Sequence, residues 1–568
     1  MEQSSWFRHY DEGVPKTLRP YPERTLLDYI ADTAREHPDF PALLFKGMRV
    51  SYGELERVTD AFAVSLAEMG VKRGDRVALL LPNCPQFIIA ELGAWKAGAT
   101  ICPLNPMYTE SELIEPLVSC SPETMVTLTP FYNRIKKIQP NTKLKRVIAT
   151  NIKEFLPPLL RLFFTLFKEK KEGHRIHLQP ADLWFNDLLK TKGPVKKVGV
   201  SINLDDPAVI LLSGGTTGTP KGAVGTHRSL VITGLQYASW GKNLKSEMKD
   251  IAMLPLPLFH SYANAGTQSE VFVSGEALSL IPNPRDIKDV LNTIRKVRPT
   301  FFAGVPTLFI ALMNHPDVKR GKVDFKSIKM WFSGAAPLMA ETKKSFEELT
   351  GSRILEGYSL TEAMLAGIIN PALGVHKIGS VGIPLPDVEV RIADPEFGDK
   401  ILPTGEVGEI LMRAPQLMQG YWENPEETAR VLQIHGEGGP WLHTGDLGYM
   451  DIEGYIFIVD RKKDLIKPSG FQVWPREVEE VVSSHPAVLE VGVAGVADDY
   501  QGEAVKAWVV LRPGQQVTVD EIRQYCRQKL APYKVPKHVE FRESLPKSMV
   551  GKVLRRVLAQ EEKTKRTQ

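Results

Sequence analysis

The sequence is poor in cysteine and lacks long apolar runs. Only four cysteines occur among 568 residues, Cys84, Cys102, Cys120 and Cys526, and no two of them form a C-x-x-C pair. A disulfide framework or a zinc site is therefore not expected, and the composition fits a reducing compartment. No apolar stretch reaches the roughly 18 residues that span a bilayer, and the acidic N-terminus lacks the apolar core of a signal peptide. We therefore predict a cytoplasmic location.

The sequence also lacks a strong charge of either sign. Its formal net charge is +4, which is too small to indicate a nucleic-acid partner. Hydrophobic residues make up 43% and charged residues 24%, as in an ordinary globular protein. The length predicts roughly three or four domain-sized units.

Alternating helical and strand patterns fill the first hundred residues. Apolar residues spaced by three and four between Leu55 and Met69 predict a helix that ends at Gly70. Residues 77–81 and 100–104 read as strands, with a helix over 85–98 between them. A strand, helix, strand order predicts an α/β fold with a parallel sheet and crossover helices.

The pattern changes after residue 380. Short β-like segments such as 388–392 and 409–412 predict a β-rich subdomain. Beyond residue 460 a smaller α+β unit is expected, with strands at 489–493 and 504–511 and a helix at 520–530. We expect an N-terminal domain of layered α/β subdomains over 1–459 and a C-terminal domain over 460–568. The charged end EEKTKRTQ is predicted to be disordered.

Residues 155–171, FLPPLLRLFFTLFKEKK, form a mostly apolar stretch with a basic end. The stretch is too short to span a bilayer but suits the plane of a membrane interface, and an ordinary buried helix is the alternative. Pro157 and Pro158 are compatible with such a helix only at its first turn. Peripheral contact with the inner face of the membrane is the hypothesis that follows.

Residues 211–223, LLSGGTTGTPKGA, have the composition of a phosphate-binding loop. Glycines allow close backbone approach, and hydroxyls and Lys221 supply donors and a positive charge. The apolar run 208–212 predicts that the loop leaves the end of a buried strand, where ligands of α/β sheets usually bind. Pro220 before the lysine and Gly222 after it exclude the G-x-x-x-x-G-K-[ST] pattern. A glycine-rich turn without a ligand is the alternative.

Further motifs follow this loop in order. They are LPLPLFHSY (254–262), EGYSLTEA (356–363), WLHTGDLGYM (441–450), DRKKDLIKPSGFQVWPREVE (460–479) and LPKSMVGKVLRR (545–556). Together they resemble the adenylate-forming superfamily over nearly the whole chain, most closely its bacterial long-chain fatty acid–CoA ligases. The resemblance implies an AMP-forming ligase that uses ATP, Mg²⁺ and CoA, with a mobile C-terminal domain hinged near Asp460.

The resemblance also assigns residues to the activation step. Lys552 would bridge the substrate carboxylate and phosphate oxygens, His260 would join the catalytic residues, and Glu362 with Thr217 would hold the metal. The residues expected to hold the triphosphate are Ser213, Gly214, Gly215, Thr216, Thr217, Gly218, Thr219 and Lys221.

Other residues would bind the nucleoside and CoA. Asp446 is expected to accept hydrogen bonds from the ribose hydroxyls, as an ionised carboxylate suits a vicinal diol, and Tyr358 to stack on adenine. The remaining nucleotide contacts implied are Gly334, Ala335, Ala336, Glu356, Gly357, Ser359, Thr361, Arg461 and Lys463. The segment facing the thioester-forming site would contain Ser469, Gly470 and Phe471.

The resemblance also implies a pocket for the acyl chain, lined by residues 261–278 and expected to be apolar. This segment nevertheless contains the polar residues Asn264, Gln268, Ser269 and Glu270. These either face away from the pocket on a helix or shorten and polarise it. Alternatives therefore remain: an aryl- or short-chain acyl-CoA ligase, an acyl-adenylate donor to a separate carrier protein, or a membrane-associated fatty acid carrier without activity. The sequence is also compatible with an oligomer.

Overall fold

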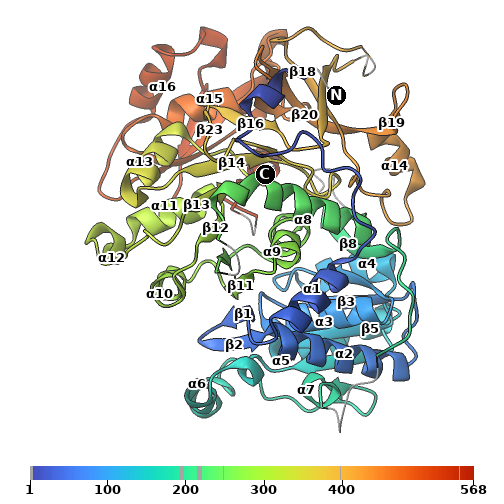
Figure 1. Cartoon of the computed structure of the whole chain (residues 1–568). Coiled ribbons are helices and arrows are strands. Elements are labelled where there is room, and N and C mark those ends of the chain that lie inside the picture. The colour runs from blue at the N-terminus through green and yellow to red at the C-terminus, as the bar shows by residue number, and fades with distance from the viewer. Residues whose placement is uncertain are drawn as a thin grey trace.

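The structure is a computed structural model, which describes residues 4–190, 197–213, 220–246, 249–396, 398, 400–548 and 551–567. These residues form three β-sheets with helices packed on them (Figure 1). The mixed α/β architecture and the small C-terminal α+β domain confirm the predicted fold class.

The first sheet has seven strands in the order β7-β6-β5-β3-β4-β8-β9. All neighbouring strands are parallel except β8 and β9, which form an antiparallel pair. The strands are β3 (Arg76–Leu80), β4 (Thr100–Pro103), β5 (Thr124–Leu128), β6 (Arg146–Thr150), β7 (Leu183–Trp184), β8 (Pro207–Ser213) and β9 (Lys221–Thr226).

Helices α2 (Tyr52–Glu68) and α3 (Pro85–Lys96) match the predicted periodic segments. Nearly every residue of α3 is buried, because the helix packs between the sheet and α2. Helices of the same region are α1 (Leu26–Glu36), α4 (Glu110–Cys120), α5 (Thr129–Ile138), α6 (Pro158–Phe163) and α7 (Phe185–Leu188).

The second sheet has fourteen strands and changes character along its length. From β1 to β14 its strands pair in parallel, except for the β1–β2 hairpin, and from β14 to β17 they pair antiparallel. The parallel part contains β1 (Pro41–Phe45), β10 (Ile251–Leu254), β11 (Ala277–Leu280), β12 (Phe301–Gly304), β13 (Met330–Ser333) and β14 (Ile354–Tyr358), with β2 (Met48–Ser51) at its edge.

The antiparallel part is the predicted β-rich subdomain. Its strands are β15 (Ile368–Ile369), β16 (Ser380–Pro384), β17 (Glu389–Ala393), β18 (Gly408–Arg413), β19 (Leu432–Ile434), β20 (Pro440–Met450) and β21 (Ile456–Arg461). Tyr358 ends β14, so it lies where the sheet switches from parallel to antiparallel pairing.

Helices cover the parallel part of this sheet. They are α8 (His227–Gly241), the π-helix η6 (Tyr262–Gln268), α9 (Ser269–Ser274), α10 (Ile287–Val297), α11 (Pro306–Asn314), α12 (Pro316–Lys319) and α13 (Ala340–Thr350); α14 (Pro425–Val431) lies in the β-rich part.

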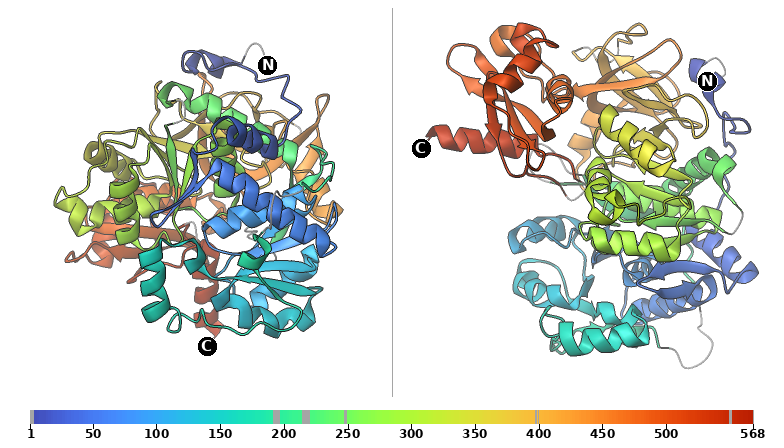
Figure 2. Two further views of the ribbon diagram at one scale, coloured as in Figure 1. Left: turned by 60° about the horizontal axis from the view of Figure 1, so that its bottom comes forward. Right: turned by 90° about the vertical axis from the view of Figure 1, so that its left-hand side faces the viewer.

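The C-terminal domain stands beside the antiparallel strands (Figure 2). It contains a three-stranded sheet and its helices: β22 (Val488–Asp498), β23 (Gly502–Leu511), β24 (His538–Phe541), α15 (Pro475–Ser483), α16 (Val519–Arg527) and α17 (Arg555–Thr567).

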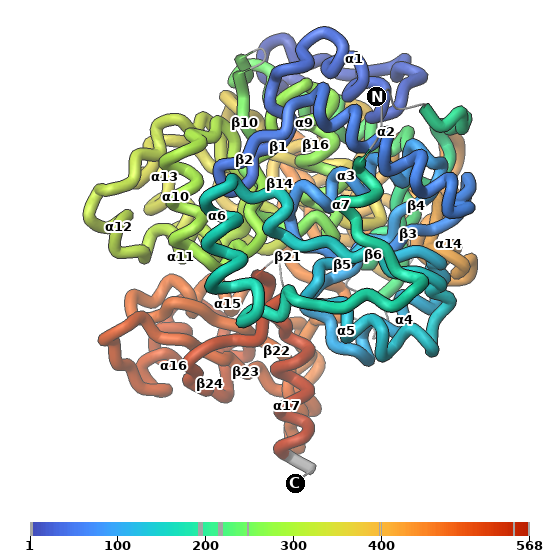
Figure 3. Tube along the Cα trace, turned by 90° about the horizontal axis from the view of Figure 1, so that it is seen from below, coloured from blue at the N-terminus to red at the C-terminus, as the bar shows by residue number. Residues whose placement is uncertain are grey.

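The prediction of a disordered C-terminus was wrong for residues 561–567, which form the last turns of α17 (Figure 3). Leu558 anchors this helix in a cluster around Trp508. Glu562 then accepts a hydrogen bond from Lys506 at 2.7 Å, and Glu561 accepts one from Arg542 at 2.7 Å. The charged residues are therefore held by partners on the sheet and directly after β24, which composition alone does not reveal.

Within residues 155–171, helix α6 begins at Pro158, as the prolines predicted. It continues as the π-turn η4 (Phe164–Lys168). Among the described residues, no helix is both long and apolar enough to cross a membrane.

Candidate active site

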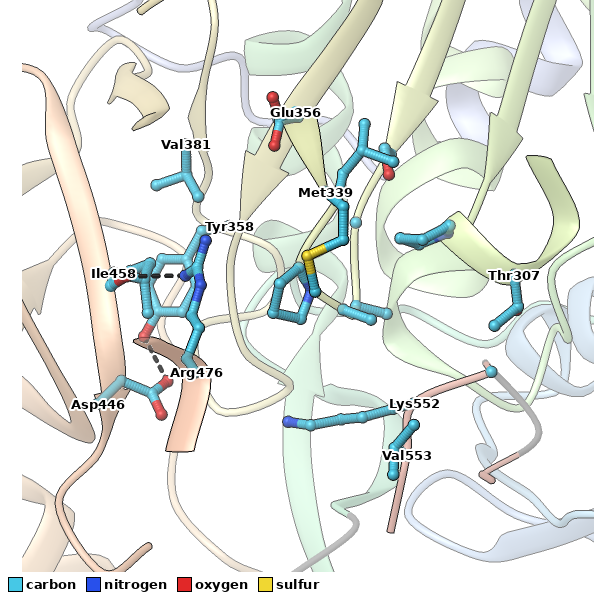
Figure 4. Close-up of a pocket in the computed structure, with 18 of the residues that line it drawn as sticks. Thr307, Met339, Glu356, Tyr358, Val381, Asp446, Ile458, Arg476, Lys552 and Val553 are labelled. Carbon is cyan, nitrogen blue, oxygen red and sulfur yellow. Dashed lines mark hydrogen bonds between the residues drawn. The ribbon is translucent and has the colours of Figure 1, made fainter. Parts of the chain in front are cut away.

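A cleft of about 2680 Å³ lies between the central sheet, the antiparallel strands and the C-terminal domain. Figure 4 shows part of it, with Lys552 pointing into the space from the C-terminal domain. The predicted residues that line this cleft are Ser213, Lys221, His260, Gly334, Ala335, Ala336, Glu356, Gly357, Tyr358, Ser359, Thr361, Glu362, Asp446, Arg461, Lys463 and Lys552.

One group of predicted residues is described by the structure but is not in this lining. Ser469, Gly470 and Phe471 lie on a turn of the C-terminal domain, where the Phe471 ring stacks on Tyr533 with centroids 4.8 Å apart. Outside the described residues lie Gly214, Gly215, Thr216, Thr217, Gly218 and Thr219.

Asp446 is the centre of a buried polar group at the switch point of the sheet. The Tyr358 hydroxyl donates to its Oδ2 at 2.7 Å, and the Arg461 Nε lies 3.1 Å from its Oδ1. Asp446 and Arg461 face each other across the β20–β21 pair, so the strand register brings them together. Burial and the neighbouring Asp446 raise the pKa of Tyr358 well above its usual value, which keeps the hydroxyl a donor.

The turn after β13 is shaped for close approach of a ligand. Ala335 has a φ of 66°, a conformation that costs a non-glycine residue on the order of 1 kcal/mol or more. A Cβ on Gly334 would lie 3.0 Å from the Tyr262 ring. The Ser333 hydroxyl is buried without a hydrogen-bond partner in the described part of the chain. Strained backbone and unsatisfied buried polar groups cluster at ligand sites, so this turn is a candidate contact for a bound ligand.

Glu356 and Ser359 line the same cleft, within β14 and directly after it. Burial raises the pKa of the Glu356 carboxyl, and Lys343, whose Nζ lies 2.9 Å away, opposes this effect. The Ser359 hydroxyl donates to the Ala366 carbonyl at 2.7 Å. Unlike the Ser333 hydroxyl, it is therefore paired within the protein.

The ends of the predicted phosphate loop lie at the mouth of the β8–β9 hairpin, where Ser213 pairs with Lys221. The Lys221 Nζ lies 2.5 Å from Glu427 of α14 and 5.3 Å from the centre of the Tyr421 ring. The Tyr421 hydroxyl donates to Glu362 Oε1 at 2.8 Å. Glu427 and Tyr421 were not predicted as site residues, because neither lies in one of the sequence motifs.

Glu362 fits a magnesium ion that is held mainly by phosphate. No cluster of three or more potential protein ligands occurs in the part of the chain that the structure describes. Mg²⁺ commonly binds one or two carboxylates together with substrate phosphates and water. A single carboxylate beside the phosphate loop is consistent with that chemistry.

Lys552 reaches the cleft from the segment between β24 and α17. Burial lowers the pKa of its ammonium group to about 8, and repulsion by Arg461 acts in the same direction while Asp446 opposes it. Gly551 fixes this segment against α11, since a Cβ there would lie 2.0 Å from the Thr307 hydroxyl. The lysine is thus held as a cation that loses its charge just above neutral pH.

His260 follows β10 and is neutral at physiological pH, because burial lowers its pKa to about 4. Its Nδ1 accepts a hydrogen bond from the Tyr262 amide at 3.3 Å. This assigns the proton of the neutral ring to Nε2, which leaves one donor for a ligand.

A buried ion-pair group surrounds Asp460, which lies in β21. Its carboxylate accepts hydrogen bonds from the Arg555 guanidinium at 2.6 Å and from the Arg476 amide at 2.7 Å. Arg555 also donates to both oxygens of the buried Glu479, at 2.9 and 2.6 Å. Arg555 belongs to the motif at 545–556, but its partners Glu479 and Asp460 lie 76 and 95 positions earlier in the chain.

The polar residues of the predicted acyl segment face away from the cleft. Asn264 and Gln268 donate their amide hydrogens to the two oxygens of Glu91 on α3, each at 2.6 Å. Glu270 pairs with Lys245, and the Ser269 hydroxyl is directed to the Asn264 carbonyl at 3.4 Å. Of the two alternatives, the structure therefore supports a helix that turns these polar side chains away from the cleft. The side chains that line the cleft here are Tyr237, Phe259, Tyr262, Ile310, Met313 and Leu365.

Two families of known sequences match this chain. The AMP-binding enzyme family matches residues 30–422, and the AMP-binding enzyme C-terminal domain matches residues 477–552. A long-chain-fatty-acid–CoA ligase of Bacillus subtilis is 38% identical over 99% of this chain and 98% of its own length. The ligase of the same name from Haemophilus influenzae is 37% identical over 99% of both chains.

Solved structures share the architecture. The anthranilate CoA ligase AuaEII in complex with anthranoyl-AMP superimposes with a TM-score of 0.84 at 26% identity, covering 96% of this chain and 99% of its own. ATP-bound MatB from Rhodopseudomonas palustris gives a TM-score of 0.81 at 28% identity, covering 94% and 98%.

Proposed function

The chain belongs to the AMP-binding enzyme family, and from that premise we propose that it is an AMP-forming fatty acid–CoA ligase. The acid would first be activated with ATP to an acyl-adenylate and then transferred to the thiol of CoA. The observation that carries the proposal is the cleft that contains Asp446, Glu362 and Lys552 together, in a chain similar over its full length to long-chain-fatty-acid–CoA ligases.

In the first step, a carboxylate oxygen attacks the α-phosphorus, and the bond from that phosphorus to the pyrophosphate oxygen breaks. Both reactants are anions, so positive groups must screen their approach. Lys552 is placed for this task because it points into the cleft as a compact cation. Lys221 and the loop 213–221 would hold the leaving pyrophosphate.

Asp446 and the turn 333–336 would orient the nucleoside. An ionised carboxylate accepts both hydrogens of a vicinal diol, and Arg461 holds the Asp446 side chain in place. The Tyr358 ring would stack on the base. Glu362 would hold Mg²⁺, which supplies neutralisation of phosphate charge, and Thr217 is proposed as a second ligand.

In the second step, the CoA sulfur forms a bond to the acyl carbonyl carbon, AMP leaves with the bonding electrons, and the thiol proton passes to solvent. We infer that the C-terminal domain, residues 460–568, turns about Asp460 between the steps. Ser469, Gly470 and Phe471, which now lie away from the cleft, would then face it. Such gating movements are common in enzymes with two half-reactions.

A fatty acid suits the acyl side of the cleft. The side chains exposed there are mainly apolar or aromatic, and the amide and carboxyl groups of the 264–270 segment are bound to Glu91 and Lys245 instead. Each methylene group removed from water contributes about 0.8 kcal/mol, so an apolar wall favours a long chain over acetate.

We also propose that the enzyme acts in the cytoplasm, in peripheral contact with the inner face of the membrane. The support is the exposed apolar segment 155–171 and a substrate that partitions into lipid. ATP and CoA, the two other substrates of the proposed reaction, are charged and water-soluble.

Pyrophosphate release by the purified protein tests the proposal. The assay would contain ATP and Mg²⁺ with acids from acetate to oleate and benzoate, with and without CoA. We expect release that peaks with medium or long chains and depends on CoA for turnover, and a loss of at least about 100-fold in Lys552→Ala.

Lys547→Ala provides the matched control, because Lys547 lies on the same segment and pairs with Glu490 at 2.6 Å. A peak at benzoate or at acetate would replace the fatty acid with an aryl or short acid. Activity unchanged in Lys552→Ala, or no release with any acid, would contradict the ligase function.

A further inference from the structure

Six large apolar side chains are exposed along one short helical segment, α6 and η4. Leu159, Leu166 and Phe167 expose 71%, 64% and 68% of their surface. The others are Leu160, Leu162 and Phe163. We call this set the α6 face. Single exposed apolar residues are normal, but a contiguous group of this size marks an interaction site.

The segment is fastened to the body by other residues, so the α6 face has no part in the core. Phe164 is buried and its ring packs edge-on against His174, with centroids 5.0 Å apart. His174 in turn shares a hydrogen bond with the Thr129 hydroxyl at 2.8 Å. Glu169 is also buried, where it binds Lys153 and the Asn151 amide. Because these contacts hold the helix against the body of the protein, its outer residues are exposed to solvent.

The charges around the α6 face are positive. Arg161, Lys170 and Lys171 are exposed at its edge. Of the nearby acids, Glu169 is buried, and Glu172 lies 3.4 Å from Lys168. An apolar surface with a basic border is complementary to anionic lipid headgroups above an acyl layer.

The α6 face is connected to helix α10 through the β1–β2 turn. Pro157 packs on the β1–β2 turn, since a Cβ on Gly47 would lie 3.6 Å from its ring. Lys46 of that turn pairs with Asp289 of α10 at 2.5 Å. Helix α11 follows β12 after α10 and supplies Ile310 to the cleft. In Figure 1, α6 lies at the bottom of the view, with α10 above it and α11 further up.

We propose that residues 157–168 dock the protein on a bilayer with anionic headgroups, with the α6 face in the interface and the basic border on the lipid phosphates. Docking in this orientation places the side of the molecule that carries the β1–β2 turn and α10 nearest the membrane, where a fatty acid is dissolved. This inference depends on the proposed membrane location but not on the ligase activity. Membrane binding and ligase activity are therefore measured in separate assays.

Co-sedimentation of the full-length protein with vesicles tests the docking. Vesicles of phosphatidylcholine alone would be compared with vesicles that also contain phosphatidylglycerol. We expect stronger binding to the second kind and weaker binding at high salt. The variant Phe163→Ser/Leu166→Ser/Phe167→Ser should bind at least about tenfold more weakly, because three large apolar side chains no longer enter the interface.

Two further variants separate the contributions. Lys170→Glu/Lys171→Glu should lose the preference for the anionic vesicles. Ile378→Ser/Ile434→Ser/Ile452→Ser removes three other highly exposed apolar side chains, at 85%, 77% and 81% exposure, and should bind as the unchanged protein does.

Equal vesicle binding by the α6-face variant and the unchanged protein would overturn the proposal. So would a dimer that forms without lipid and dissociates in that variant, since the face would then be covered by a second copy. Turnover of a water-soluble acid without vesicles should stay unchanged in the α6-face variant. A protein that docks but turns over no acid would contradict the ligase function and leave the docking intact.

Discussion

The Arg555 guanidinium lies 2.6 Å from the Asp460 carboxylate, and this contact ties the first residue of the C-terminal helix to the strand that enters the C-terminal domain. The same guanidinium binds both oxygens of the buried Glu479. The proposed hinge is thus tied to the C-terminal domain by a charge network, while Asp460 and Arg461 also pair with β20 in the antiparallel sheet.

We therefore predict that Arg555→Ala destabilises the C-terminal domain. Removing one partner of a buried ion pair leaves uncompensated charge and typically costs about 3–5 kcal/mol. Thermal unfolding should show a lower transition temperature, and trypsin should cleave faster after Lys462 or Lys463. Arg555→Lys should have a transition temperature between those of Arg555→Ala and the unchanged protein, because lysine keeps the charge but loses the paired hydrogen bonds. Arg556→Ala is the control, since Arg556 is exposed; equal effects of the two alanine variants would contradict the assignment.

The charge of Lys552 predicts a pH dependence of the first half-reaction. Its pKa is lowered to about 8, so the cation is present below that pH and is lost as the pH rises through it. Pyrophosphate exchange, measured without CoA to avoid ionisation of the thiol, should fall above about pH 8. Lys552→Arg keeps its charge at any such pH, so the variant should be slower at neutral pH but should not show this decline. The same decline in Lys552→Arg would exclude Lys552 as its source.

Glu427 is predicted to compete with ATP for Lys221. The two side chains lie 2.5 Å apart, and this pairing lowers the pKa of Glu427. Phosphate oxygens must share or replace that contact when they bind. Glu427→Gln should therefore lower the KM for ATP by about two- to fivefold, as expected for a partly exposed ion pair. Glu426→Gln, one position earlier on the same helix and exposed, should leave KM unchanged. A higher KM in Glu427→Gln would mean that Glu427 positions Lys221 for ATP.

The sequence predicted well those features that depend on local pattern. The spacing of apolar residues predicted α2, α3 and the strands β3 and β4, because local sequence pattern and burial in the fold agree there. The motifs pointed to Asp446 and Lys552, which the fold brings to one cleft although 106 positions separate them in the sequence.

Features that depend on long-range pairing could not be predicted. Glu427 and Tyr421 gain their positions beside Lys221 and Glu362 only through the fold. The C-terminal segment looked disordered because its charged residues seemed unpaired, and their partners Lys506 and Arg542 lie on other elements. Glu91 offered a signal, since a single acid stands in the apolar run QFIIAELGAW, but its amide partners were 173 and 177 positions away.

Glu91 itself leads to the last prediction. Burial raises the pKa of its carboxyl from 4.5 to about 7, and the hydrogen bonds from Asn264 and Gln268 only partly oppose this effect. A carboxyl whose pKa is raised by folding stabilises the folded state at low pH, and that contribution is lost as the pH rises through the folded value. Between about pH 5 and pH 8 the free energy of unfolding should thus fall by up to about 3 kcal/mol relative to Glu91→Gln.

Glu91→Gln should remove this dependence. The glutamine keeps the shape and carries no charge. One of the two partner amides can keep donating to its Oε1, while the other can rotate to present its carbonyl oxygen, now without a partner in the described part of the chain, to the new NH2 group. Urea unfolding of both proteins across this pH range gives the comparison, and groups common to both cancel. Glu68→Gln, exposed on the neighbouring helix α2, should follow the unchanged protein at every pH. If Glu91→Gln also follows it, the Glu91 carboxyl must be ionised throughout, held so by its two amide donors against the cost of burial.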